Sequence, residues 1–212
     1  METWTCPTCH DAGFVRIEVG LDDKGFGQAH PCPQCRPKPT AHGLPLGLDR
    51  CTFENFDLNL NSRMEEAYQA ALAVADGQRW AAVLVGPPGL GKSHLAASAL
   101  IYRGGIFWET GALLRNIRHL AFDDRGPKLA EEDVLATFQD YRGLLVLDDY
   151  GAEKSTEWAE QTLYAILNAR YLGRLPTIIT TNNPNSIDER LFSRYATSMV
   201  VCAGADLRLK GL

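Results

Sequence analysis

Residues 80–94 read WAAVLVGPPGLGKSH, and this stretch decides the fold. A short apolar run of strand formers enters a loop with the spacing G-x-x-x-x-G-K-S, and the apolar helical stretch LAASALIY follows it. This order of strand, glycine-rich loop and helix is the context that confirms a phosphate-binding loop, or P-loop. Its glycines let backbone N–H groups turn inward as an anion nest, and the helix N-terminus adds partial positive charge. The sequence therefore predicts a nucleotide site at Gly86, Pro87, Pro88, Gly89, Leu90, Gly91, Lys92, Ser93 and His94.

Acidic side chains are expected beside this loop. Lys92 should reach the β- and γ-phosphates, and Ser93 should ligate Mg²⁺. Residues 144–149, LLVLDD, are typical of a buried parallel strand that ends in two aspartates. We expect Asp148 to hold Mg²⁺ through water and Asp149 to orient and polarise the attacking water.

A further central strand is predicted in PTIITTNN, residues 176–183, because Thr177–Thr181 is rich in β-branched residues. It ends in Asn182 and Asn183, which would lie at the carboxyl edge of the sheet near the γ-phosphate. The alternative is a plain Asn-Asn-Pro turn after a strand.

Composition limits the class of protein. The chain has 212 residues, 45% of them hydrophobic, and a formal charge of −5, which argues against coating nucleic acid by bulk charge. No apolar run approaches the ~18–20 residues that span a membrane. The first residues have neither a basic nor an apolar signal region, so we expect a cytoplasmic protein without membrane partners.

Four of the six cysteines lie in two C-x-x-C pairs, which predicts a zinc site. A hairpin between the pairs would bring the four thiolates together in a zinc-ribbon-like module: Cys6, Cys9, Cys32 and Cys35. A redox dithiol or two unrelated turns are the alternatives. A proline-rich connector follows, so we expect a cysteine-rich module at 1–36, a linker at 37–47 and a larger domain at 48–212.

Taken in order, the motifs of residues 48–212 resemble those of the AAA+ ATPases. The closer resemblance is to DnaC/DnaI-type replicative helicase loaders and the related IstB-type transposase-helper ATPases. It rests on TFENFD, GPPGLGKSHLA, LLVLDDYGAE, STEWAEQTLYAILNARY, PTIITTNN, LFSRY and ADLRL. It implies an α/β fold, a P-loop NTPase of AAA+ type with a parallel sheet flanked by helices. Only four residues follow Arg208, so we expect no helical lid domain.

The resemblance also implies roles for single residues. Asn182 becomes the sensor of the γ-phosphate, and Arg208, in ADLRL, becomes the second sensor. Arg194, in LFSRY, matches the arginine finger that completes a neighbouring subunit's site, with Arg190 as the second candidate. For each arginine the alternative is a solvated charge or a local ion pair. Adenine is expected to pack against residues that precede the P-loop: Thr52, Phe53 and Phe56.

A possible DNA contact lies between the P-loop helix and LLVLDD. In loaders of this type the matching region touches single-stranded DNA, which implies phosphate contacts by basic side chains within 115–128: Arg115, Arg118, Arg125 and Lys128. The alternative is an ordinary solvated helix face, which the acidic neighbours of these residues favour.

The function that the resemblance implies is that of an ATP-dependent loader of a replicative hexameric helicase, from a bacterium or a phage. It would use ATP, Mg²⁺ and structural Zn²⁺, bind single-stranded DNA and self-associate through its ATPase domain. Three alternatives stay open: an IstB-type transposase helper, a nucleotide-gated adaptor without productive hydrolysis, and a redox protein built on the cysteine pairs. The adaptor is considered because Asp149 is one methylene shorter than glutamate.

Overall fold

The computed structural model describes residues 6–8, 14–16, 29–31, 40–60, 62–122, 129–152, 156–204 and 206. The chain divides into two compact units, Met1–Thr40 and Ala41–Leu212. In the first unit, β1 (Phe14–Arg16) pairs antiparallel with β2 (Ala29–Pro31), as a hairpin between the cysteine pairs requires. Cys9, Cys32 and Cys35 lie outside the described residues, so the zinc site stays a prediction.

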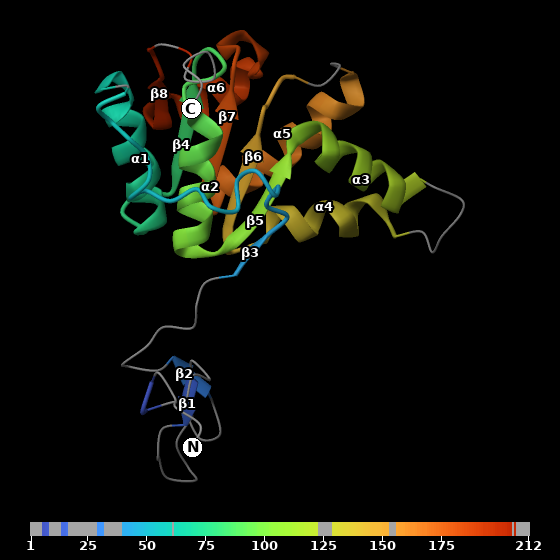
Figure 1. Ribbon diagram of the computed structural model, residues 1–212. Coiled ribbons are helices and arrows are strands. Elements are labelled where there is room, and N and C mark those ends of the chain that lie inside the picture. The colour runs from blue at the N-terminus through green and yellow to red at the C-terminus, as the bar shows by residue number, and fades with distance from the viewer. Residues whose placement is uncertain are drawn as a thin grey trace. The chain divides into compact units, whose positions relative to one another are not determined.

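A six-stranded parallel sheet forms the centre of the second unit, with the strand order β3-β5-β6-β7-β4-β8 (Figure 1). The predicted central strands are confirmed, and all residues of β4, β6 and β7 are buried. Parallel strands covered on both faces read as continuous apolar or β-branched runs, which is why these three were recognisable. The strands are β3 (Ala41–His42), β4 (Ala81–Val85), β5 (Gly105–Glu109), β6 (Leu144–Asp148), β7 (Thr177–Thr181) and β8 (Met199–Val201).

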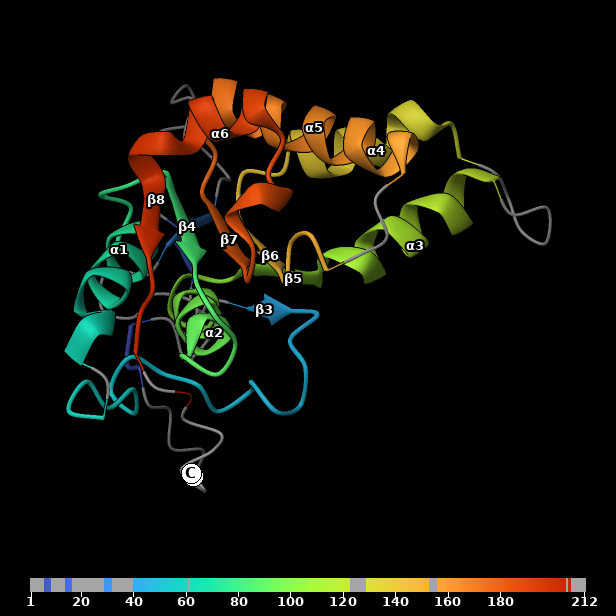
Figure 2. The same cartoon turned by 90° about the horizontal axis from the view of Figure 1, so that it is seen from above.

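Helices cover both faces of this sheet (Figure 2). Alternate residues of β4 point to opposite faces, so Ala82 and Leu84 pack in one core cluster while Ala81, Val83 and Val85 pack in the other. The first cluster includes α1 (Glu65–Ala75) and α2 (Lys92–Arg103). The second includes α3 (Thr110–Phe122), α4 (Glu131–Gln139), α5 (Glu157–Leu172) and α6 (Glu189–Tyr195). Short 3-10 turns complete the unit: η1 (Ser62–Met64), η2 (Pro184–Ser186) and η3 (Ala196–Ser198).

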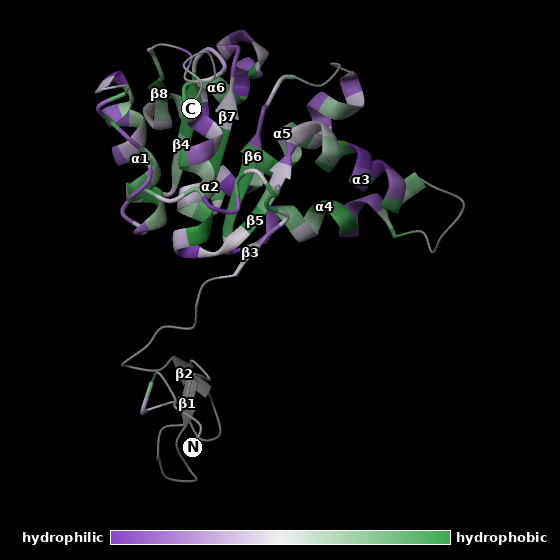
Figure 3. Ribbon diagram, viewed as in Figure 1, coloured by the Kyte–Doolittle hydropathy of each residue, from purple (hydrophilic) through white to green (hydrophobic). Residues whose placement is uncertain are grey.

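Hydropathy follows this layering. Figure 3 shows strand β4 in the hydrophobic colour, while polar residues lie on the helices around it. Within the described residues, no helix is both long and apolar enough to cross a membrane.

Part of the predicted linker belongs to the sheet. Ala41 and His42 form β3 and pair with Gly105 and Ile106 of β5. Gly43 follows with a positive φ of 72°, and a Cβ there would collide with the carbonyl oxygen of Phe107. A two-residue strand has too little sequence to show a period of two, so composition alone assigned it to the connector.

A fully buried arginine joins the amino ends of two strands to the helices beside them. Arg170 of α5 donates hydrogen bonds to Thr177 Oγ1 at 2.9 Å and to four backbone carbonyl oxygens. These are the carbonyls of Phe138 at 2.9 Å, Tyr141 at 2.8 Å, Gly143 at 3.1 Å and Pro176 at 2.7 Å. Burial lowers the pKa of Arg170 to about 10, so the guanidinium stays charged at neutral pH. One side chain therefore fixes where α4 ends and where β6 and β7 begin.

Replacing this side chain should destabilise the fold strongly. Arg170→Met leaves several buried carbonyls without a donor, and we expect the free energy of unfolding to fall by about 3–5 kcal/mol. Arg142→Met is the matched control because Arg142 is exposed, and it should change the value by less than about 0.5 kcal/mol. Urea unfolding followed by circular dichroism measures both. Equal effects of the two substitutions would contradict the role given to Arg170.

Candidate functional site

The P-loop connects β4 to α2 at the carboxyl edge of the sheet. Gly89 and Gly91 have φ values of +78° and +91°, which glycine adopts without strain. A Cβ at Gly91 would lie 2.6 Å from the Phe56 ring, and one at Gly86 would collide with the carbonyl oxygen of Cys202. Gly91 is the N-cap residue of α2 and has no side chain to cap the helix N-terminus. The first N–H groups of α2 therefore suit an anion.

Lys92 is the buried cation of the site, with 5% of its surface exposed. Its ammonium donates to the carbonyl oxygens of Gly86 and Pro87, both at 2.7 Å, and to Asn182 Oδ1 at 2.9 Å. These three acceptors are neutral. The ammonium can exchange any of these three for a phosphate oxygen.

Asp148 and Ser93 come together as a candidate Mg²⁺ site. Asp148 is 8% exposed, and its Oδ1 accepts a 2.6 Å hydrogen bond from Thr180 Oγ1. Burial raises the pKa of Asp148, while hydrogen bonds from Thr180 and Ser93 and the charge of Lys92 act in the opposite direction. A carboxylate and a hydroxyl beside a phosphate loop are the oxygen ligands that Mg²⁺ takes together with phosphate. The residues present therefore fit Mg²⁺ bound with a nucleotide.

Asp149 has an unusual backbone conformation. Its φ of 52° lies in the left-handed region, and its N–H donates to Thr180 Oγ1 at 3.0 Å. Asn182 Nδ2 donates to Asp149 Oδ1 at 3.3 Å. The amide of Asn182 therefore contacts both Lys92 and Asp149, and Thr180 contacts both aspartates. Sequence reasoning named the aspartates, Lys92 and Asn182 but missed Thr180. Thr180 lies in β7, and the only sequence feature that marks it is its position two residues before Asn182.

The residues expected near adenine lie beside the first turns of α2. His94 Nε2 lies 3.0 Å from the carbonyl oxygen of Thr52, and the Phe56 ring packs edge-on against the His94 ring at 5.2 Å. Phe53 is buried and packs against Tyr68 at 5.3 Å between ring centres. These contacts anchor the segment before α1 to the P-loop helix. Adenine packing by these residues stays a prediction.

The two candidate arginine fingers lie on α6 and differ in their contacts. Arg190 donates to both carboxylate oxygens of Asp188, with Nε–Oδ1 2.9 Å and Nη2–Oδ2 2.8 Å. Arg194 donates through Nη1 to the carbonyl oxygen of Arg190 at 2.8 Å. Arg208, the candidate second sensor, lies outside the described residues.

Two of the basic residues expected to contact DNA line a cavity of about 370 Å³ between α3 and the start of α5. Arg115 forms an exposed ion pair with Glu109 at 3.2 Å, and the guanidinium of Arg118 lies 4.6 Å from the centre of the Trp158 ring. Trp158 in turn donates to Glu131 Oε1 at 2.8 Å. Arg125 and Lys128 lie outside the described residues.

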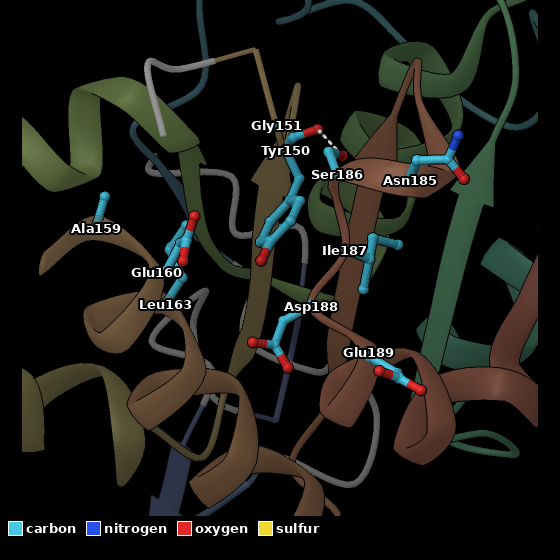
Figure 4. Close-up of a pocket in the computed structure, with 10 residues that line it drawn as sticks. All are labelled: Tyr150, Gly151, Ala159, Glu160, Leu163, Asn185, Ser186, Ile187, Asp188 and Glu189. Atoms are coloured by element: carbon cyan, nitrogen blue, oxygen red, sulfur yellow. Dashed lines mark hydrogen bonds between the residues drawn. The ribbon is translucent and has the colours of Figure 1, made fainter. Parts of the chain in front are cut away.

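Sequence reasoning missed a larger pocket of about 490 Å³ (Figure 4). It lies between the end of β6, the segment after β7 and the first turns of α5, and Ser186 Oγ lies 3.5 Å from the carbonyl oxygen of Tyr150 at its rim. Three of its lining residues are acidic: Glu160, Asp188 and Glu189. Because the lining comes from three separate segments, no sequence motif could have revealed it.

Fold and site together define a nucleotide-binding protein with the P-loop fold of the AAA+ type. The family described as IstB-like ATP binding protein matches residues 44–197, which is most of the chain, so the chain belongs to this family. This confirms the resemblance on which the residue roles were based.

Among individual proteins, the chain is 32% identical over 170 residues to a putative insertion sequence ATP-binding protein of Sinorhizobium fredii, covering 74% of this chain and 52% of that protein. It is 28% identical over 139 residues to the replicative helicase loader DnaC of Escherichia coli, covering 63% of this chain and 56% of that protein. The chain thus spans about half the length of the relatives it matches. A crystal structure of the DnaC helicase loader has the same fold, with a TM-score of 0.61 and 22% identity over 74% of this chain and 98% of that one.

The pKa shift of Asp148 gives a test. A carboxyl whose pKa is raised by folding stabilises the fold when protonated, and this contribution is lost as the pH rises through the raised pKa. Without nucleotide and Mg²⁺ at pH 7.5, Asp148→Asn should therefore have a higher Tm than the parent, and the difference should shrink as the pH falls into the mildly acidic range.

Adding ATP with Mg²⁺ should stabilise the parent more than the variant, because the variant lacks the carboxylate ligand. Thermal scans across the pH range measure both effects, with Asp149→Asn as the neighbouring control. A lower Tm of Asp148→Asn at every pH would contradict this reading of the site.

Proposed function

We propose that the chain is an ATPase that loads a replicative hexameric helicase onto DNA in the cytoplasm. The observation that carries the ATPase part is the contact of one amide, Asn182, with both Lys92 and Asp149. The Asn182 amide thus connects Lys92, which would bind phosphate, to Asp149, which would orient the attacking water. Family membership supports ATP as the nucleotide.

Hydrolysis would rest mainly on positioning and charge neutralisation. Lys92 would bind the β- and γ-phosphates, and Ser93 with Asp148 would hold Mg²⁺, which neutralises phosphate charge when bound. Asp149 would orient the attacking water and accept its proton. Asn182 would fix Asp149 relative to the γ-phosphate, and Thr180 would hold both aspartates in place.

Of the two arginines, Arg194 is the better candidate for a finger that acts on a neighbouring subunit. The guanidinium of Arg190 already forms a bidentate ion pair with Asp188. Arg194 contacts no carboxylate among the described residues, and its one hydrogen bond to protein goes to a carbonyl oxygen. A finger that acts in trans would make hydrolysis depend on self-association.

Helicase loading is favoured over the other roles by the N-terminal unit. Two cysteine pairs on either side of an antiparallel strand pair are the arrangement that a zinc-binding module needs, and such a module would contact the helicase. Arg115 and Arg118 would contact the phosphates of single-stranded DNA, with Trp158 holding Arg118 in place.

A second candidate is a transposase helper, favoured by the family match and by the insertion sequence relative. It would use the same nucleotide chemistry but recruit a transposase to duplex DNA. The third candidate, a nucleotide-gated adaptor, would bind ATP without useful turnover. The fate of bound ATP in a single turnover separates the adaptor from the first two.

Loading is tested with the purified full chain, the replicative helicase of the same organism and single-stranded DNA covered by its binding protein. We expect DNA unwinding only when the chain and ATP are both present. Cys32→Ser/Cys35→Ser should lose stoichiometric zinc and helicase binding but keep ATP binding, because its P-loop is unchanged. Stimulation of a transposase from the same genome, with no helicase loading, would contradict the proposal and support the helper.

A further inference from the structure

Aromatic rings and arginines alternate where α5 lies beside α6. The guanidinium carbon of Arg190 lies 4.0 Å from the centre of the Tyr164 ring. That of Arg194 lies 5.6 Å from Tyr164 and 6.0 Å from Tyr171. We call these two tyrosines of α5 the α5 platform. Tyr164 therefore touches both candidate fingers.

Asp188 gives the two arginines different freedom. It binds Arg190 through two side-chain hydrogen bonds and also accepts the backbone N–H of Arg190 at 2.8 Å. These hydrogen bonds hold the pKa of the Asp188 carboxyl below its usual range. The Arg190 guanidinium is thus held between the Tyr164 ring and the Asp188 carboxylate, which balances its charge.

Arg194 uses little of its binding capacity inside the described chain. A guanidinium has five N–H donors, and Arg194 spends one nitrogen, Nη1, on the carbonyl oxygen of Arg190. The rings of Tyr164 and Tyr171 and the Arg190 carbonyl fix its position without neutralising its charge. This arrangement presents an oriented cation to an anion outside the chain.

We infer that Tyr164 is a positioning residue that holds Arg194 in the geometry needed to reach the nucleotide bound by a second copy of this chain. The inference rests on the proposed function and deepens it. An arginine side chain loses much rotamer freedom when it is fixed, and a preformed contact with an aromatic ring reduces that loss at the moment of binding. The Tyr164 ring makes this contact with Arg194. The Tyr164 hydroxyl has no hydrogen bond to any described residue, so we assign the positioning role to the ring.

Mixed assemblies test the inference with full chains. Arg194→Ala subunits keep an intact nucleotide site but lack a finger, whereas Asp149→Asn subunits lack turnover but keep Arg194. Mixing the two should restore hydrolysis at the sites of the Arg194→Ala subunits. Tyr164→Leu is then added to one partner at a time, and kcat and KM for ATP are measured.

We expect Tyr164→Leu in the Asp149→Asn donor to lower the restored kcat about 3- to 10-fold with little change in KM. The same substitution in the Arg194→Ala acceptor should leave the restored rate unchanged, since the acceptor's platform is not used. Tyr164→Phe in the donor should restore hydrolysis like the parent donor, because the ring is kept.

Each other outcome overturns a defined claim. If Tyr164→Leu lowers the restored kcat equally in the donor and in the acceptor, Tyr164 acts on the fold of its own subunit. If the Asp149→Asn donor restores hydrolysis equally with and without Tyr164→Leu, the ring does not position Arg194. Absence of rescue by the Asp149→Asn donor with its platform intact would instead overturn the trans-acting finger of the proposed function, and the inference with it.

Discussion

The Lys92 ammonium is the charge on which the arrangement of the nucleotide site depends. It is buried at the end of the P-loop and is held by two carbonyls of the loop and by the side chain of Asn182, directly after β7. A buried cation without these acceptors would be costly, so the P-loop and the end of β7 must lie together in the folded chain. The same contact ties Asn182 to Asp149, and so the phosphate-binding cation is connected to the water-side carboxylate.

The parallel sheet makes this meeting of residues possible. β4 pairs with β7, and β7 pairs with β6, so the P-loop, the two aspartates and Asn182 all follow strands at one carboxyl edge. Thr180 then fixes both aspartates from within β7. At the opposite edge, Arg170 holds the beginnings of β6 and β7 through carbonyl groups. The strands that carry the chemistry are thus fixed at both ends.

The sequence was sufficient to predict the parts of the chain that are long, apolar or rich in glycine. Burial on both faces gives β4, β6 and β7 continuous strand-forming runs, and the P-loop has a fixed spacing. β3 and β8 are too short to show a period, so the sheet edges were not predicted. The ion pair of Asp188 with Arg190, the roles of Thr180 and Arg170, and the pocket beside Tyr150 depend on contacts between distant segments or on side-chain direction, which residue spacing does not reveal.

The most direct test compares two neighbouring asparagines. Asn182 contacts Lys92 and Asp149, whereas the Asn183 side chain accepts the N–H of Asn185 and caps η2. Steady-state ATP hydrolysis under conditions of self-association should fall about 100-fold in Asn182→Ala and stay within about threefold of the parent in Asn183→Ala, with ATP binding kept in both. Equal rates for the two variants would contradict the claim that the Asn182 amide couples phosphate binding to hydrolysis.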